Sequence, residues 1–277
     1  MKITAADVNK LRQQTGAGMM DCKKALQEAE GDFDAAVDIL RKKGQKVAAK
    51  RSDRDAAEGL VLAKTTADGK KGVMVVVNCE TDFVAKNDDF GKFANKILDA
   101  ALSNIPADID SLKNLPFEGN GATIAEKITE QTGVIGEKID LSAYEQISAE
   151  TVYAYNHPGN KLAAMVGLNK SGDLDEVAKD VAMQVAAMNP VALDKDAVTQ
   201  DVIDREIEVG KDLAIQEGKP ADMAEKIAMG RLNKFFKENT LLNQQYIKDN
   251  KMSIAQYLKE FDGDLSVTEF KRCALGE

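Results

Sequence analysis

Residues 73–87 read VMVVVNCETDFVAKN, and this stretch decides the fold class of the chain. Its first five residues form an apolar run that is typical of a buried strand. Thr81 or Asp82 can then begin a helix, because the side-chain oxygen of either residue can cap free backbone amides. Phe83 lies at the corner between strand and helix. Its ring can either tuck beneath its own sheet or point outward as a wedge.

This strand belongs to a strand–strand–helix order that occurs twice along the chain. In sequence order, the predicted elements are strands at 59–65 and 72–79, a helix at about 88–102, a loop at 105–121, a helix at 122–131, a segment at 133–139 that leads towards a strand, strands at 150–156 and 161–169, and a helix at 174–188. The repeated order predicts an α+β fold with two related α+β subdomains.

The N-terminal region predicts three short helices around a small core. Thr4 and Asp7 have the spacing of a capping box at the start of the first helix. The second helix covers about 19–30, and we expect Gly44 to end the third. Residues 46–54 are charged and are interpreted as a linker, for which a helical conformation is one alternative.

Residues 201–239 differ from both subdomains. They predict two helices joined by Gly218-Lys219-Pro220, with a narrow apolar seam and otherwise charged surfaces. Such a seam is typical of a projecting antiparallel coiled-coil hairpin. The predicted domains are an N-terminal three-helix domain with its linker at 1–54, one α+β subdomain at 55–140, and a second at 141–277 that includes the hairpin.

Composition narrows the class of function. A net charge of −9 makes the chain a poor general binder of nucleic acid, because phosphate contacts need clustered Lys and Arg. The N-terminus lacks the apolar core of a signal peptide, and no apolar run has the length of a membrane span. The chain has three widely spaced cysteines and one His, and no Gly-rich phosphate loop of the GxxxxGK type. We therefore expect a cytoplasmic binding protein with no metal, no cofactor and no enzyme activity.

Three motifs resemble the elongation factor Ts family. They are residues 15–26 (TGAGMMDCKKAL), residues 78–87 (NCETDFVAKN) and the hairpin residues around Gly218-Lys219-Pro220. The resemblance covers nearly the whole chain in order, and it implies a UBA-like N-terminal domain. It also implies guanine-nucleotide exchange on elongation factor Tu, a GTPase that itself holds the nucleotide. Some members continue past a similar Leu-Gly-Glu, so for a chain that ends at Glu277 the resemblance implies either a shorter interface or compensation elsewhere.

The resemblance also implies which residues contact the GTPase. Phe83 would wedge between helices near its magnesium and phosphate site, and Asp82 would support that geometry. The full set of implied contacts is Thr81, Asp82, Phe83, Val84, Met19, Met20, Lys23, Ile135, Gly136, His157, Tyr246 and Ile247.

Several of these residues have simpler interpretations. One of the two methionines, Met19 or Met20, can fill the small core, since Met suits irregular gaps. Ile135-Gly136 can begin a strand, and His157 can be an ordinary surface residue at a hairpin turn. The alternative function for the whole chain is a non-exchanging interaction scaffold with a UBA-like module. A carboxylate-based enzyme is disfavoured, because nothing pairs Glu80, Asp82 and Asp88 with a substrate pocket.

Overall fold

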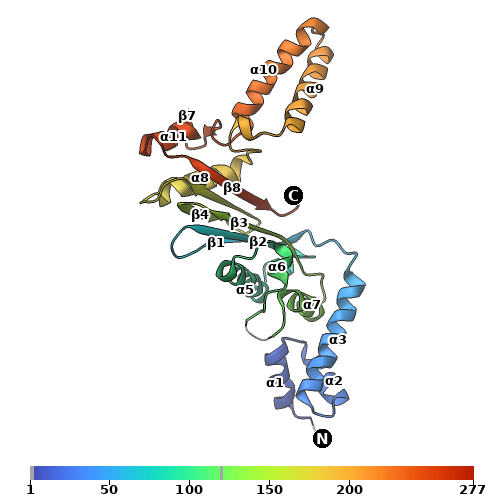
Figure 1. The fold of residues 1–277 in the computed structure, drawn as a ribbon. Coiled ribbons are helices and arrows are strands. Elements are labelled where there is room, and N and C mark those ends of the chain that lie inside the picture. Colours follow the sequence, from blue (N-terminus) through green and yellow to red (C-terminus); the bar gives the residue numbers. More distant parts are fainter. Residues whose placement is uncertain (1–2, 119–120) are drawn as a thin grey trace. The chain divides into compact units, whose positions relative to one another are not determined.

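The computed structural model describes residues 3–118 and 121–277 and combines helices with strands (Figure 1). The predicted α+β class is therefore confirmed. Contacts divide the chain into two compact units. The first contains residues up to Leu62, Met74–Glu145 and Ala274–Glu277, and the second contains Ala63–Val73 and Gln146–Cys273. The finer division into domains near residues 54 and 140 stays a prediction.

The first unit begins with the three predicted helices, α1 (Ala5–Thr15), α2 (Met19–Glu28) and α3 (Phe33–Arg51). The predicted capping box of Thr4 and Asp7 is present at the start of α1. The helices enclose a small apolar core that consists of Val8, Leu11, Ala17, Cys22, Ala25, Leu26 and Ala36. These helices are short, so most of their stability comes from this shared core.

The prediction that Gly44 ends the third helix is wrong, because α3 continues through Gly44 to Arg51. Gly44 is buried and lies against Gly133 of α7 (Ile124–Ile135). A Cβ atom on Gly133 would come within 2.3 Å of the Gly44 Cα atom. Glycine disfavours a helix interior, but here its missing side chain lets two helices approach closely. Most of the expected linker is therefore the end of α3.

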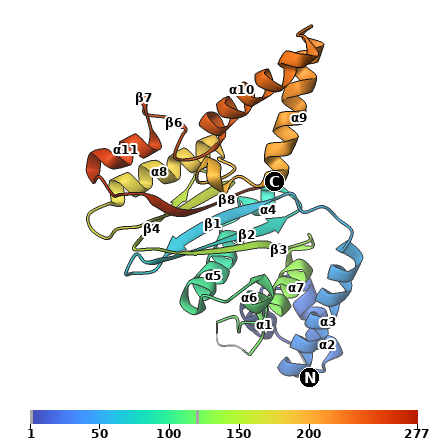
Figure 2. The same ribbon diagram turned by 45° about the horizontal axis from the view of Figure 1, so that its top comes forward.

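One sheet contains β1 (Glu58–Thr65), β2 (Lys71–Cys79) and β3 (Asp140–Ser148) in the order β1-β2-β3. Helices α5 (Asp88–Asn104) and α7 lie on the same side of this sheet (Figures 1 and 2). The apolar side chains of α5 are buried; they are Phe90, Phe93, Ala94, Ile97, Leu98 and Ala101. The one-turn helix α4 (Asp82–Ala85) connects β2 to α5.

Two segments between α5 and β3 differ from expectation. The expected loop contains a short helix, α6 (Ile109–Lys113), which Asp108 caps by accepting from the Ser111 amide at 2.7 Å. Helix α7 continues beyond the expected end to Ile135, and Gly136 closes it with a φ of 79°. The alternative that Ile135-Gly136 begins a strand is therefore wrong, since Gly136 has the left-handed conformation of a helix C-cap.

The second unit contains the predicted hairpin of β4 (Thr151–Asn156) and β5 (Leu162–Leu168), which pair antiparallel from Thr151–Leu168 to Asn156–Ala163. Strand β8 (Val267–Ala274) completes a sheet of order β4-β5-β8. Helix α8 (Asp175–Met188) packs on this sheet with a largely apolar face. The remaining small elements are η1 (Lys195–Ala197), β6 (Gln245–Tyr246), β7 (Asp249–Ser253) and α11 (Ile254–Phe261).

The predicted helical hairpin is formed by α9 (Gln200–Gln216) and α10 (Ala221–Asn239), which lie side by side (Figures 1 and 2). The two helices approach closely at Gly210, where an added Cβ atom would lie 3.1 Å from the Ala228 Cα atom. Arg231 and Glu217 form an ion pair of 2.7 Å across the two helices. Among the helices of residues 3–118 and 121–277, none has both the length and the apolar character that a bilayer span requires.

Candidate partner-binding surfaces

The Phe83 corner, defined as residues 80–87, presents an aromatic ring to solvent. Thr81 is the N-cap of α4, and its hydroxyl accepts from the Val84 amide at 3.4 Å. Phe83 is 84% exposed, although it lies between an entirely buried strand end and the amphipathic helix α5. Of the two orientations that the sequence allows for this ring, the structure has the outward one.

The carboxylate of Glu137 fixes the start of this corner. The Thr81 amide donates to Glu137 Oε2 at 3.0 Å, and the Thr81 hydroxyl donates to Oε1 at 2.7 Å. Glu137 directly follows Gly136, the residue that closes α7. The end of α7 therefore sets the position of the backbone two residues before Phe83.

Glu80 also holds this corner. Arg51 donates to both carboxylate oxygens of Glu80 at 2.8 and 2.9 Å, and the Lys138 amide donates to Oε1 at 2.6 Å. The hydrogen bond from Lys138, together with Arg51, keeps the pKa of Glu80 below its usual value. Asp82 forms an ion pair of 2.6 Å with Lys86. The backbone around the exposed ring is thus held by hydrogen bonds and ion pairs.

A cavity of about 620 Å³ in the first unit groups two of the expected contact residues. Val84 and Ile135 both line it, with Thr15 and Gly16 at the end of α1 and Phe90 and Phe93 from α5. Gly136 is the adjacent helix cap. Phe83 is not among the lining residues, so its ring and this cavity are separate features of the surface.

The methionines of α2 are both exposed, Met19 at 57% and Met20 at 62%. The expectation that one of them fills the core is wrong, because Cys22, Ala25 and Leu26 supply the buried face of α2. Lys23 is exposed as well. An apolar and cationic surface therefore begins at the N-terminus of α2.

In the second unit, His157 and Ile247 line one cavity of about 260 Å³. Both residues are exposed, and His157 Nδ1 lies 3.0 Å from the Tyr155 hydroxyl. Tyr246 differs, because it is only 5% exposed and its hydroxyl donates to Asp180. A direct contact by Tyr246 does not suit this burial. The structure leaves Ile247 as the residue of this pair that can reach a partner.

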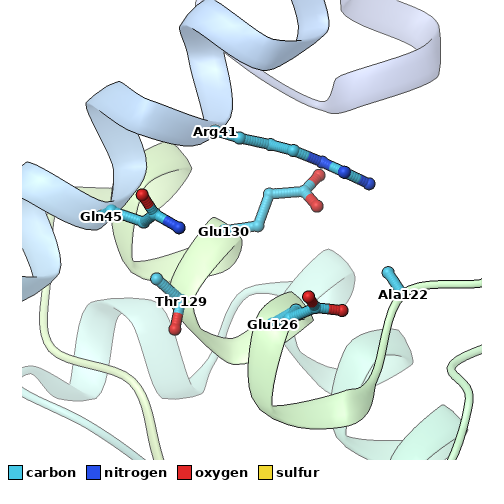
Figure 3. Close-up of a pocket in the computed structure, with 6 residues that line it drawn as sticks. All are labelled: Arg41, Gln45, Ala122, Glu126, Thr129 and Glu130. Atoms are coloured by element: carbon cyan, nitrogen blue, oxygen red, sulfur yellow. The ribbon is translucent and has the colours of Figure 1, made fainter.

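A smaller cavity of about 140 Å³ lies between α3 and α7. Figure 3 shows Arg41 and Gln45 of α3 directed across it, and Glu126, Thr129 and Glu130 of α7 on the other side. None of the contact residues expected from sequence lines it. Within the described residues, no group of three or more His, Cys, Asp or Glu side chains could hold a metal ion.

Sequence reasoning missed Glu137 and the role of Glu80. Glu80 lies inside the quoted stretch, but its partner Arg51 is 29 residues away, within the expected linker. Glu137 follows the Ile135-Gly136 pair, and its bond to Thr81 spans 56 residues. The sequence shows only that Glu80 precedes Thr81 and that Glu137 follows Gly136. It does not show which distant residue each carboxylate binds.

Comparison with known proteins identifies the family. A family model described as elongation factor TS matches residues 80–277. Three curated relatives named elongation factor Ts come from Christiangramia forsetii (58% identical, covering 99% of both chains), Amoebophilus asiaticus (55%, 100% of both) and Flavobacterium psychrophilum (53%, 99% of both). The chain shares the class of these proteins, the elongation factors. It belongs to the elongation factor Ts family, and the resemblance found in its motifs is confirmed.

Proposed function

We propose that this chain is a guanine-nucleotide exchange factor that binds elongation factor Tu and promotes GDP release during translation elongation. Family membership over nearly the whole chain supports the general role. The observation that carries the mechanism is the Phe83 ring, 84% exposed on a corner that Glu80 and Glu137 hold by hydrogen bonds. A rigid aromatic side chain on a fixed backbone suits an interface hot spot, because little freedom remains to be lost on binding.

In this mechanism, Phe83 inserts between helices of the GTPase near its magnesium and phosphate site, and Asp82 supports that position. Burying one Phe side chain contributes about 1.5–3 kcal/mol. Each tenfold weakening of nucleotide binding requires about 1.4 kcal/mol of differential binding. The ring therefore accounts for about one to two decades of weakening. The coupling is reciprocal, so bound GDP weakens the factor to the same degree.

Other surfaces supply the energy that holds Phe83 in place. Met19, Met20 and Lys23 are the proposed contacts of α2. Val84, Ile135 and Gly136 are those beside the cavity of the first unit. In the second unit, His157 and Ile247 meet a distal domain of the GTPase, and Tyr246 supports Ile247 from within the core.

The proposal assigns no covalent chemistry to this chain, so it is not an enzyme in that sense. The partner binds the nucleotide, and this chain needs no cofactor. The net charge of −9 argues against a direct nucleic-acid partner. The proposed place of action is the cytoplasm, where translation factors work.

The test is GDP release from elongation factor Tu loaded with a fluorescent GDP, measured by stopped flow. We expect Phe83→Ala to fold normally and to lower the maximal release rate about ten- to hundredfold, in line with the burial of one Phe. Val191→Ala, at a residue that is 55% exposed in the second unit, is the matched control and keeps the wild-type rate.

Full activity of Phe83→Ala would overturn the wedge mechanism. A wild-type chain that is retained by the GTPase in a pull-down but releases no GDP would instead support the non-exchanging scaffold.

A further inference from the structure

Helix α8 carries two buried polar side chains, Asp180 and Gln184, on a face that is otherwise apolar. They are four residues apart, so they lie one above the other on one side of the helix. Asp180 is 5% exposed and Gln184 is fully buried. Both make hydrogen bonds to residues 244–248, which we call the Ile247 turn.

Asp180 accepts three hydrogen bonds, two from this turn and one from α11. The donors are the hydroxyl of Tyr246, the hydroxyl of Tyr257 at 3.1 Å, and Lys248 Nζ at 2.6 Å. The rings of Tyr246 and Tyr257 stack with centroids 4.2 Å apart. Burial alone would raise the pKa of Asp180, but these three donors outweigh it and the pKa is lowered. The carboxylate is therefore ionised, and it holds the residues on both sides of Ile247.

Gln184 fixes the backbone between those side chains. Its Oε1 accepts from the Ile247 amide at 2.9 Å, and its Nε2 donates to the Gln245 carbonyl and to Gln244 Oε1, both at 3.1 Å. A buried amide with all these bonds made defines one backbone path, because any shift of the turn would leave buried polar groups unpaired.

The result is an apolar side chain held at a fixed place. Ile247 is 43% exposed between two residues bonded to Asp180. It forms one wall of the cavity that His157 and Leu162 also line. The other walls include Met183 and Ala187 of α8, so the helix that fixes the turn also supplies part of the cavity.

We propose that Asp180 and Gln184 are positioning residues that hold Ile247 against the His157 cavity, so that this cavity receives an apolar side chain of the GTPase. The proposal rests on the exchange function proposed above. It predicts that the two sites affect different quantities. Phe83 sets the maximal rate of GDP release, whereas the Ile247 turn sets the concentration of factor that gives half of that rate.

The experiment measures GDP release at increasing concentrations of the full chain. In Asp180→Asn and Gln184→Leu, we expect the half-saturating concentration to rise about five- to tenfold, the size of one moderate interface contact, with the maximal rate unchanged. Gln184→Glu keeps an acceptor for the Ile247 amide but loses both donated bonds and places a buried carboxylate against the Gln245 carbonyl, so it is expected not to restore the affinity. Tyr246→Phe keeps the stacked ring but loses one bond to Asp180, and it gives a smaller rise.

A double-mutant cycle separates positioning from general damage. If Asp180 acts through Ile247, Asp180→Asn adds no further loss of affinity to Ile247→Ala. Additive losses of affinity in the Asp180→Asn, Ile247→Ala double mutant would overturn the proposal. So would a lower maximal rate of GDP release in Gln184→Leu, if that variant unfolds at the same temperature as the wild type. If Ile247→Ala leaves the half-saturating concentration unchanged while Phe83→Ala lowers the maximal rate, only this inference is overturned. A wild-type chain without exchange activity would overturn the proposed function itself.

Discussion

The Phe83 corner and the Ile247 turn both hold an exposed apolar side chain in a fixed position, but with different polar groups. Each exposes one large apolar side chain, Phe83 at 84% and Ile247 at 43%. In each, a distant side chain bonds to a backbone amide at or near that residue: Glu137 at the amide of Thr81, and Gln184 at the amide of Ile247. An apolar contact on a short turn is thus made rigid by polar groups from elsewhere in the fold.

The two sites differ in how far the side chains of their ion pairs are exposed to water. At the corner, the ion pair of Arg51 and Glu80 is partly open to water, with side chains 34% and 16% exposed. At the turn, the side chains of the Lys248–Asp180 pair are 50% and 7% exposed. Water screens a partly exposed pair, whereas an unpaired buried charge is costly. The carboxylate at the turn therefore lies deeper than the one at the corner, and its hydrogen bonds are screened less by water.

The largest effect is expected where the corner depends on helix packing. Gly133→Ala would place a methyl group 2.3 Å from the Gly44 Cα atom, so α3 and α7 must separate. We expect the free energy of unfolding, measured by urea titration, to fall by about 1–3 kcal/mol. Because Glu137 follows the end of α7, GDP release should slow as well.

Gly44→Ala is the matched control for that crossing. A methyl group there meets its nearest atoms at 3.6–3.8 Å, which is ordinary contact. Alanine also suits a helix better than glycine by up to about 1 kcal/mol. The variant should be as stable as the wild type or more so. If both variants lose the same free energy of unfolding, the close approach of Gly133 to Gly44 is not what holds α3 and α7 together at the corner.

A smaller effect is expected from the carboxylate at the corner itself. Glu137→Ala leaves the Thr81 amide and hydroxyl without their acceptor, and the cost of a lost bond to a charged group is about 1.5–3 kcal/mol when buried. Thr81 is only partly buried, so we expect the maximal GDP release rate to fall about tenfold or less, near 1.4 kcal/mol. Glu137→Gln retains one acceptor and should lose less.

The half-saturating concentration serves as the internal check for this pair of variants. It should change little, since the contacts of α2 and of the Ile247 turn remain. A change in that concentration with an unaltered maximal rate would mean that Glu137 serves binding in the way proposed for Gln184, and the contrast between the two sites would be lost.

The sequence predicted those parts of both sites that depend on neighbouring residues. The apolar run of 73–77, the cap at Thr81 and the hairpin around His157 are local patterns, and the structure contains each of them. The family and the α+β class followed from motifs and from the order of elements. The outward orientation of Phe83 could not be chosen from the sequence, since both orientations satisfy the local pattern.

The rest depended on partners far apart in the chain. Gly44 resembled a helix end because glycine disfavours helices, and only its contact with Gly133 explains its place inside α3. Tyr246 resembled a contact residue, and only its bond to Asp180, 66 residues away, explains its burial. Polar side chains such as Gln184 carry no periodic signal, so the residues that fix the turn could not be identified without the fold.

The smallest effect concerns the charge at the Ile247 turn. Lys248→Met removes the ion pair with Asp180, and because Lys248 is 50% exposed we expect a loss of no more than about 1 kcal/mol at neutral pH. The pKa of Asp180 is lowered from 3.8 in the folded chain, so the pair stabilises the fold above that pH and ceases to do so as acid protonates the carboxylate. The stability difference between wild type and Lys248→Met should therefore shrink as the pH falls below 3.8. A difference that stayed constant in urea titrations through that range would show that Lys248 stabilises the turn by packing its aliphatic stem, and the buried charge at Asp180 would then be held by the two tyrosines alone.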